Sequence, residues 1–426
     1  MNKTFQIVLL IVFGLFVIIA VIVFALGSSS GTDVAQIGGV VNVWGPFPQR
    51  PMELLFGEMR DQYEQFEVNY TEHDPRTLKG DLVEALASGR GPDLVILPHT
   101  ELAGQIDRLI PVSYEFIGER VYDDTFADAA SIYKTSAGIY AFPFAADPLV
   151  MFWNKTIFAN SGVAIPPKHW NEFLTLAPTI TKKSGNNFSQ SLVALGDGGN
   201  VLYTKEILSA LTMQTGNPIV RYNDGMAEVV LDEGDGASSA LQFFIEFANP
   251  NKTAYSWNSA QPPSREAFAG GNVAIYFGRA SDIGLIRELN PHLDFDITIL
   301  PQIKDSQLRV TYTDVYGVSI TRGAPNPEGA YAVASLLTFG PFANRLPELL
   351  SLPPLRRDVL SLKPTDTIMP VLFESTIIAR IWPDPNPEAT NEIFKNMVSQ
   401  VTVGRLTAED AISRAQSLLA NLIKPI

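Results

Sequence analysis

The sequence predicts a protein of class α/β, folded into two lobes and preceded by one transmembrane helix. Three observations support this prediction. The chain has 426 residues and 46% apolar content, which is enough to bury two sizeable cores. Strand-like and helix-like segments alternate between Val40 and Leu97. A long apolar run occupies residues 7–26, close to the amino terminus.

The apolar run Ile7–Leu26 contains no charged residue and would span about 30 Å as a helix, which matches the core of a bilayer. Lys3 precedes it, and Asp33 is the first charge after it. We therefore expect a single-pass anchor in the cell membrane, with a cytoplasmic amino terminus and the binding domain on the extracytoplasmic side. A secretory signal peptide is the alternative, because Ala25–Gly27 fits a small-residue cleavage site.

The segments after this run alternate in the way that a sheet covered by helices requires. Strands are expected at 40–44, 66–70 and 93–97, and helices at 54–66 and 78–87. The alternation predicts a mainly parallel sheet. Ligands bind at the carboxyl ends of the strands in such folds, which here are Trp44–Phe47 and Pro98–Glu101.

The stretch Gly138–Asn154, GIYAFPFAADPLVMFWN, consists of two strand-like runs separated by Asp147-Pro148. Proline lacks a backbone donor and restricts the residue before it, so we expect two strands that meet at a kink rather than one continuous strand. The carboxylate of Asp147 lies among apolar neighbours, where a charge is costly without a polar partner. Asp147 is therefore a candidate ligand contact, or a turn residue that caps its own backbone.

Composition excludes several kinds of partner and chemistry. Lys and Arg total 31 against 45 Asp and Glu, for a net charge of −14 with no basic run, so we expect no nucleic-acid partner. The chain has no cysteine, which excludes disulfides, thiolate metal sites and a catalytic thiol. No zinc-protease, nucleophile-elbow or phosphate-loop motif occurs. We therefore expect no enzyme activity, no cofactor and no metal.

Several segments together carry a resemblance to a known family. In chain order they are SGRGPDLVIL, GIYAFPFAADPLVMFWNKTIF, GVAIPPKHWNEF, FAGGNVAIYFG, TYTDVYGVSIT and GRLTAEDAISRAQSLLANL. Their order and spacing resemble the extracellular solute-binding proteins of family 1, the maltose-binding-protein relatives that serve ABC importers. The resemblance covers nearly everything from Val40 to the end of the chain.

The resemblance implies a two-lobed periplasmic-binding-protein-like fold of type II with three interlobe crossovers. The crossovers would lie at Ala145–Pro148, at Tyr312–Gly317 and near Pro353–Arg356. Lobe 1 would then comprise residues 32–146 and 316–353, and lobe 2 residues 147–315 and 354–426. Residues 1–31 would form the cytoplasmic amino terminus, the anchor and a tether.

Sugar recognition, the commonest task in the family, combines aromatic faces with convergent carboxylates and amides. By motif position, the candidate ligand contacts are Trp44, His99, Glu101, Asp147, Tyr312, Asp314 and Tyr316. Besides the turn alternative for Asp147, Trp44 also fits a lid on the first helix and His99 a solvated loop residue. Trp257 and Trp382 lie in loops rich in Pro and Asn, where exposed aromatics often serve binding, and they join the candidates.

The sequence departs from the family pattern after the strand AIYFG. Sugar-binding relatives commonly have a stacking Trp there, whereas this chain has Arg279. A guanidinium suits a carboxylate or phosphate, so Arg279 is a further candidate contact, although Asp282 nearby is another partner for it. This departure leaves anionic or peptide-like ligands open beside sugars.

The predicted function is reversible capture of a small solute, a carbohydrate first of all, between the two lobes. Its partners would be the solute, the permease subunits of an ABC transporter and, through the amino-terminal helix, the membrane. We expect a monomer. The alternative is a membrane-anchored binding protein for an anionic or peptide-like ligand that acts in sensing or adhesion without transport.

Overall fold

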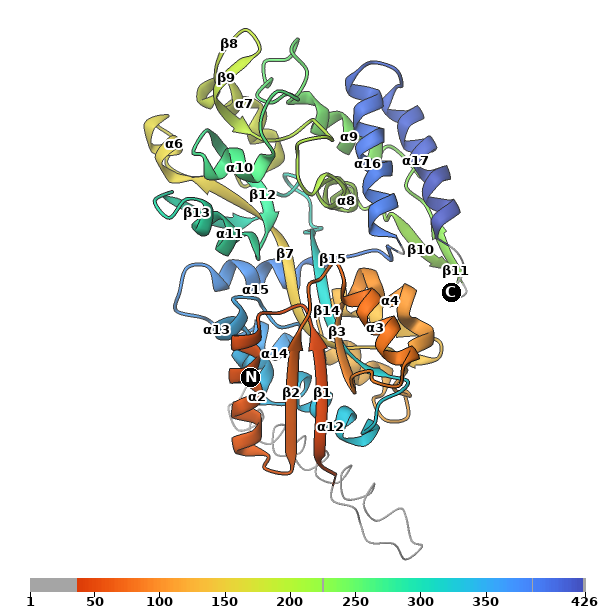
Figure 1. Ribbon diagram of the computed structural model, residues 1–426. Coiled ribbons are helices and arrows are strands. Elements are labelled where there is room, and N and C mark those ends of the chain that lie inside the picture. The colour runs from red at the N-terminus through yellow and green to blue at the C-terminus, as the bar shows by residue number, and fades with distance from the viewer. Residues whose placement is uncertain (1–36, 224–225, 385, 424–426) are drawn as a thin grey trace, which may run out of the picture.

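The protein consists of two α/β lobes, here called the N-terminal and C-terminal lobes, joined by long strands (Figure 1). The structure is a computed structural model and describes residues 37–223, 226–384 and 386–423. Strands β7 (Phe142–Asn154) and β14 (Thr311–Thr321) pair antiparallel and pass through both lobes. They join the strands into one path with the order β2-β1-β3-β14-β7-β12-β9-β8.

The N-terminal lobe is built on strands whose apolar residues face the core. β1 buries Val41 and Val43, and β3 is buried from Leu94 to Leu97, as expected for a strand covered on both faces. The predicted strands at 40–44, 66–70 and 93–97 and the predicted helix at 78–87 are confirmed. The elements of this lobe are β1 (Gly39–Gly45), α2 (Gln49–Gln62), β2 (Phe66–Glu72), α3 (Leu78–Ala87), β3 (Leu94–Pro98), α4 (His99–Gln105), η1 (Ile106–Arg108), β4 (Leu109–Ile110), α5 (Glu119–Thr125), η2 (Asp128–Tyr133), β5 (Lys134–Thr135), β6 (Gly138–Ile139), α12 (Pro327–Thr338), η3 (Pro341–Arg345), α13 (Leu346–Leu350), α14 (Arg357–Leu360), α15 (Met369–Ile377) and β15 (Ala379–Arg380).

The C-terminal lobe surrounds the far ends of the crossing strands. Its strand β12 pairs antiparallel with β7 and parallel with β9, and helices α8, α9, α16 and α17 pack together on one side (Figure 1). Its elements are α6 (Lys155–Asn160), α7 (Trp170–Ile180), β8 (Lys182–Ser184), β9 (Asn187–Val193), α8 (Thr204–Gln214), β10 (Val220–Asn223), β11 (Met226–Val229), α9 (Gly236–Glu246), α10 (Ser264–Ala269), β12 (Val273–Arg279), α11 (Asp282–Leu289), β13 (Phe295–Ile299), α16 (Pro387–Thr402) and α17 (Ala408–Leu422).

The strand directions correct one prediction. β1 is parallel to β2 and β3, as the alternation of strands and helices requires. β14 is antiparallel to β3 and β7, and β7 is antiparallel to β12 and β13, so the expectation of a mainly parallel sheet is wrong. The reason is that β7 leaves the N-terminal lobe and β14 returns to it, which makes neighbouring crossing strands run in opposite directions.

The predicted break at Asp147-Pro148 is also wrong, because β7 continues through both residues. The carbonyl of Pro148 accepts a hydrogen bond from the backbone N–H of Ala280, so its ring nitrogen faces the same side. Pairing with β12 begins only at Leu149, opposite Arg279. No ladder hydrogen bond therefore requires the N–H that proline lacks, and the strand tolerates it.

The segment after the third predicted crossover contacts both lobes. Pro353 accepts a hydrogen bond from the N–H of Ala146, so this segment lies beside β7 as expected. Arg357 and Arg380 both pair with Asp128 of η2 in the N-terminal lobe. Helix α15 also packs against β13 of the C-terminal lobe, and its Glu374 pairs with Arg309. The segment therefore contacts both lobes, and the boundary at 353/354 stays a prediction.

The predicted transmembrane helix at Ile7–Leu26 lies outside the described residues. Within residues 37–223, 226–384 and 386–423, none of the helices has both the length and the apolar character that crossing a bilayer demands.

Candidate ligand-binding site

The carboxyl ends of β1 and β3 face the C-terminal lobe beside the crossing strands (Figure 1). A cavity of about 40 Å³ opens there, between Pro46 after β1, Pro98 at the end of β3 and Tyr316 of β14. The predicted contact Glu101 also lines this cavity and pairs with Lys79 at 3.0 Å. The edge that the sequence indicated is therefore hollowed, and its lining is mainly proline and leucine, with the charges of Lys79 and Glu101 and the ring of Tyr316.

Aromatic side chains of the N-terminal lobe flank this edge. Trp44 is half-buried and lies against His73, with ring centroids 4.2 Å apart. His73 follows β2, and the alternative of a lid on the first helix stays a prediction. Tyr316 is half-buried and packs against Phe47 with a centroid distance of 4.9 Å. Both rings keep partly open faces of the kind that carbohydrate surfaces contact.

His99 is buried, with 4% of its surface exposed, so the alternative of a solvated loop residue is wrong. It is the first residue of α4, and its Nδ1 accepts the backbone N–H of Val315 at 3.4 Å. Burial lowers the pKa of the imidazole, while the nearby carboxylates of Asp314 and Asp384 oppose this shift. The neutral ring therefore carries its hydrogen on Nε2.

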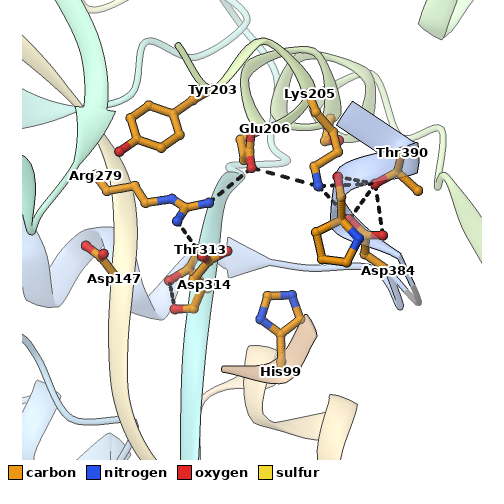
Figure 2. A network of polar contacts seen from close by, with 12 residues as sticks. His99, Asp147, Tyr203, Lys205, Glu206, Arg279, Thr313, Asp314, Asp384 and Thr390 are labelled. Atoms are coloured by element: carbon orange, nitrogen blue, oxygen red, sulfur yellow. Dashed lines mark hydrogen bonds and ion pairs between the residues drawn. The ribbon is translucent and has the colours of Figure 1, made fainter. Parts of the chain in front are cut away.

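Charged and polar side chains from both lobes meet next to His99, as Figure 2 shows. We call this set the interlobe cluster. Its members are His99, Asp147, Tyr203, Lys205, Glu206, Arg279, Tyr312, Asp314 and Asp384.

Arg279, at the end of β12, is the centre of the cluster. Its guanidinium pairs with Glu206 of α8 at 3.0 Å and with Asp314 of β14 at 2.6 Å (Figure 2). It also lies over the ring of Tyr203, 4.7 Å from the centroid. Burial opposes the charge of Arg279, but Asp314 and Glu206 hold its pKa well above the ordinary value.

The alternative that Asp282 neutralises Arg279 is wrong. The carboxylate of Asp282 is fully buried and pairs with Arg265 at 3.0 Å. It also accepts hydrogen bonds from the hydroxyls of Tyr276 and Tyr203, at 2.6 and 3.2 Å. Arg279 reaches Asp282 only through its backbone N–H, at 3.3 Å.

Asp147 lies on β7 directly opposite Asp314 of β14. It is 2% exposed and accepts hydrogen bonds from the backbone N–H of Ser281 at 2.9 Å and from its hydroxyl at 2.6 Å. Ser281 follows β12 in the C-terminal lobe and is far from Asp147 in the sequence. The alternative of a turn residue that caps its own backbone is therefore wrong. Burial raises the pKa of Asp147 to about 6, although the nearby Arg279 opposes this shift.

A second ion pair ties the last segment of the chain to the cluster. Lys205 of α8 is 2% exposed, and its ammonium contacts the carboxylate of Asp384 at 2.5 Å and the hydroxyl of Thr390 at 3.3 Å. The Thr390 hydroxyl also donates to Asp384. Both charges are desolvated, and the pair is fixed by these additional bonds.

None of the predicted contacts lies on α8. Tyr203 directly precedes this helix, whose residues are nearly all buried, and Lys205 and Glu206 are the two charges of its first turn. Charged residues in a helix buried on most faces are a signal for a polar site at its end. Tyr203 adds a second mark, because its φ of 59° is in the left-handed region that non-glycine residues rarely adopt outside functional sites.

Four buried side-chain atoms of the cluster lack a hydrogen-bond partner among the described residues. They are His99 Nε2, Tyr312 OH, Glu206 Oε2 and Arg279 Nε. Unpaired buried polar atoms are costly and uncommon in folded proteins. Their concentration at the meeting point of two lobes is typical of a site that a ligand completes.

The two remaining tryptophan candidates are not exposed, which corrects the expectation for both. Trp257 has no exposed surface, and its indole N–H donates to Asn200 at 2.7 Å within the C-terminal lobe. Trp382 is 1% exposed and donates to the Ser209 hydroxyl at 3.1 Å. The centroid of its ring lies 6.0 Å from the ammonium of Lys205, so Trp382 packs beside one cation of the cluster. Burial of a large indole ring is favourable in proportion to its apolar area, so both rings fold inward although their loops are rich in Pro and Asn.

A larger hollow of about 590 Å³ lies elsewhere, on helices α13 to α15. Its lining includes Leu362, Met369 and Phe373 and none of the cluster residues. Among the described residues, there is no group of three or more His, Cys, Asp or Glu side chains placed to hold a metal ion. The interlobe cluster is therefore the best-supported ligand site of the described chain.

Comparison with known proteins places this arrangement in a class. Bacterial extracellular solute-binding proteins share a family pattern that matches residues 56–368. The chain belongs to this family, which confirms the class that the resemblance predicted. A putative binding protein of Brucella abortus is 24% identical over 200 residues, and the match spans 46% of this chain and 46% of that relative.

Solved structures show the same fold over almost the whole chain. A solute-binding protein of an ABC transporter from Thermotoga lettingae, bound with α-D-tagatose, has 21% identity and a TM-score of 0.67 over 91% of this chain and 100% of its own. A cyclo/maltodextrin-binding protein with maltotetraose reaches a TM-score of 0.74 at 17% identity, over 92% and 98%. The cyclic α-maltosyl-1,6-maltose-binding protein of Arthrobacter globiformis also reaches 0.74, at 16% identity, over 90% and 99%. The two-lobed solute-binding fold is thereby confirmed.

Proposed function

We propose that this protein captures a carbohydrate between its two lobes and delivers it to the permease of an ABC transporter, without chemistry on the ligand. The observation that carries the proposal is the interlobe cluster, where buried polar atoms from both lobes converge without partners. Hydroxyl groups both donate and accept hydrogen bonds, so a sugar can satisfy such a mixed set. The similar structures with tagatose and maltotetraose support the same ligand class.

The contacts that we propose come from both sides of the cleft. Tyr316 and Trp44 would offer aromatic faces, while His99 and Asp314 would bind hydroxyls. Further contacts would come from Glu101, Asp147, Arg279 and Tyr312. Ligand that bridges the lobes stabilises the closed arrangement by its differential affinity for that state.

The alternative of an anionic ligand loses its main support in the structure. Arg279 is the cation that suggested it, and two carboxylates, Glu206 and Asp314, already pair with this guanidinium. An anion would have to displace one of them from a desolvated ion pair, which costs several kcal/mol. We therefore place the carbohydrate first.

The apolar run at residues 7–26 would hold the protein, as a monomer, on the outer face of the cell membrane. Tethering would raise its effective concentration near a permease in the same membrane. The test is to extract membranes of producing cells with alkaline carbonate and to weigh the intact protein by mass spectrometry. Retention at full mass supports the anchor, whereas a released chain that begins near residue 28 shows cleavage of a signal peptide instead.

The test of the proposed function is a thermal-shift screen of the full chain in detergent against mono- and oligosaccharides, polyols, sugar phosphates, amino acids and short peptides. A ligand at 100 times its dissociation constant adds about 2.7 kcal/mol to the free energy of unfolding. We expect the largest shifts from saccharides. Shifts from sugar phosphates or peptides alone would contradict the proposed ligand class.

A further inference from the structure

The interlobe cluster holds more negative than positive charge. Its carboxylates belong to Asp147, Glu206, Asp314 and Asp384, and its cations to Lys205 and Arg279. The four carboxylates are between 2% and 7% exposed. A buried charge without a counter-charge is costly. The cluster lacks two positive charges when all four carboxylates are ionised, and one when Asp147, whose pKa is about 6, is protonated.

The cations of the cluster are already engaged. Arg279 is shared between Glu206 and Asp314, at 3.0 and 2.6 Å. Lys205 is held by Asp384 at 2.5 Å and also lies 4.0 Å from Glu206 Oε1. The nearby Arg265 does not help, because it pairs with Asp282, a fifth buried carboxylate. The excess of negative charge therefore remains after every described ion pair of the cluster is counted.

One carboxylate oxygen shows where a counter-charge fits. Glu206 is 4% exposed, and its Oε1 accepts from Arg279, while Oε2 has no partner among the described residues. The unpartnered donors His99 Nε2 and Tyr312 OH belong to the same cluster. In Figure 2 the His99 ring lies on the N-terminal lobe side of the cluster, below Asp314 and Asp384. A free acceptor on a carboxylate thus lies in one site with free neutral donors.

We propose that the solute is an amino sugar or an oligosaccharide that contains one, whose protonated amino group binds Glu206 while its hydroxyl oxygens accept from His99 and Tyr312. This inference rests on the proposed function and narrows its ligand class. An ammonium is a three-fold donor and suits an acceptor-only carboxylate. It also supplies the positive charge that the cluster lacks.

Other charged occupants fit less well. Among the described residues, no group of three or more His, Cys, Asp or Glu side chains is placed to hold an inorganic cation. An anion would add to the excess of negative charge around Asp147, Glu206 and Asp314. A neutral sugar satisfies the free donors but leaves the charge excess in place.

The test is calorimetric titration of the full chain in detergent at pH 6.5 with matched ligands. Each set holds a neutral sugar, its 2-amino-2-deoxy derivative and the N-acetylated derivative of that amine. The sets are glucose, galactose, mannose and the β-1,4-linked glucose di- and trisaccharides. We expect the amine in at least one set to bind about tenfold or more tightly than both neutral members, as a charge-assisted hydrogen bond predicts.

Two variants test whether Glu206 is the carboxylate that binds the amino group. Glu206→Gln keeps the shape of the side chain and can still accept from Arg279, and we expect it to reduce the preference for the amine to about threefold or less. Glu374→Gln is the matched control, because it also neutralises one partner of a Glu–Arg pair, at 2.6 Å to Arg309, but on an exposed surface. We expect this control to keep the wild-type preference. Asp314→Asn replaces Glu206→Gln if that variant does not fold, with the same expected loss.

The outcomes separate the two proposals. A neutral sugar that binds as tightly as its amine overturns the amino-sugar inference and leaves the carbohydrate function intact. An amine preference that survives both Glu206→Gln and Asp314→Asn overturns the assigned position of the amino group. If none of these sugars, neutral or amino, binds, and the wider saccharide screen is also negative, the carbohydrate function itself fails.

Discussion

The two sides of the interlobe cleft differ in kind. The N-terminal lobe contributes half-buried rings, Trp44 and Tyr316, and one neutral imidazole, His99. The C-terminal lobe contributes the charges, with Lys205 and Glu206 in the first turn of α8 and the guanidinium at the end of β12. One wall is therefore mainly aromatic and the other is ionic.

This difference assigns separate tasks to the two lobes. Ion pairs such as Arg279 with Glu206 hold the C-terminal wall in place without ligand, which reduces the ordering that binding requires. Oriented charges discriminate between ligands, because a mismatched group is left buried without a partner. The rings of the N-terminal wall add contact area with little chemical preference. We therefore expect variants of the ionic wall to change stability and selectivity, and variants of the aromatic wall to change affinity alone.

The largest effect is expected from Arg279→Ala, which would break the ionic wall. It leaves Glu206 and Asp314 buried without their shared cation, and the side chain of Arg279 is 23% exposed. We expect the free energy of unfolding to fall by about 3 kcal/mol, measured by urea titration. Arg309→Ala, in an exposed pair, is the control and should cost less than about 1 kcal/mol. Equal losses of unfolding free energy in Arg279→Ala and Arg309→Ala would show that the ion pairs of Arg279 stabilise the protein no more than an exposed pair does.

Asp147→Asn tests the electrostatics of the same region through pH. The pKa of Asp147 is about 6 in the folded protein against an ordinary value of 3.8. The folded state therefore binds a proton more readily than the unfolded state between these values. The stabilisation that results is fully present below pH 3.8 and is lost as pH rises through 6.

The wild type should accordingly lose about 2 kcal/mol relative to Asp147→Asn between pH 4 and pH 8. The asparagine oxygen can still accept from the N–H of Ser281, so the local bonds are preserved. Urea titrations of both proteins across this range measure the difference. A constant difference at all pH values would mean that Asp147 is no more buried than an ordinary surface carboxyl.

Trp44→Ala sharpens the comparison from the aromatic side. We expect affinity for a saccharide to fall about tenfold, because one stacking face is lost. The ratio of amine to neutral affinity should stay unchanged, since this ring carries no charge. Calorimetric titration gives both values, with Phe116→Ala, an exposed ring in the N-terminal lobe, as the control. A change in the ratio of amine to neutral affinity would contradict the expectation that the aromatic wall changes affinity alone.

The smallest effect on binding is expected from Trp257→Phe. The indole is fully buried and donates to Asn200 inside the C-terminal lobe, so its loss should lower the free energy of unfolding by about 1 to 2 kcal/mol. Affinity for the ligand should not change. A large drop in affinity with unchanged stability would return Trp257 to the list of ligand contacts.

Local patterns in the sequence predict the secondary structure well and the long-range pairings poorly. The pattern of apolar residues places β1, β2, β3 and α3 at their observed positions, because β1, β2 and α3 each bury one face and β3 is a short, wholly apolar run. Pro148 led to the wrong prediction of a break in the strand. Only the register with β12 shows that no ladder hydrogen bond needs the backbone N–H that proline lacks. The antiparallel direction of β14 is likewise set by the other lobe.

The site residues also differ in whether local sequence patterns predict them. Asp147 and Asp314 are predictable because each is a polar residue in an apolar strand, where its burial demands a partner. Lys205 and Glu206 are not found by strand-end reasoning, since they reach the cluster from a helix of the other lobe. Trp257 shows the converse error, because loop composition says little about which rings fold inward.

The most direct test of the account is small-angle X-ray scattering of the full chain in detergent, before and after saturation with the best saccharide from the screen. The central claim is that the solute binds between the lobes and bridges them. It predicts a smaller radius of gyration in the bound state, as closure about β7 and β14 requires. Stoichiometric binding with an unchanged radius of gyration would contradict capture by closure and place the ligand outside the cleft.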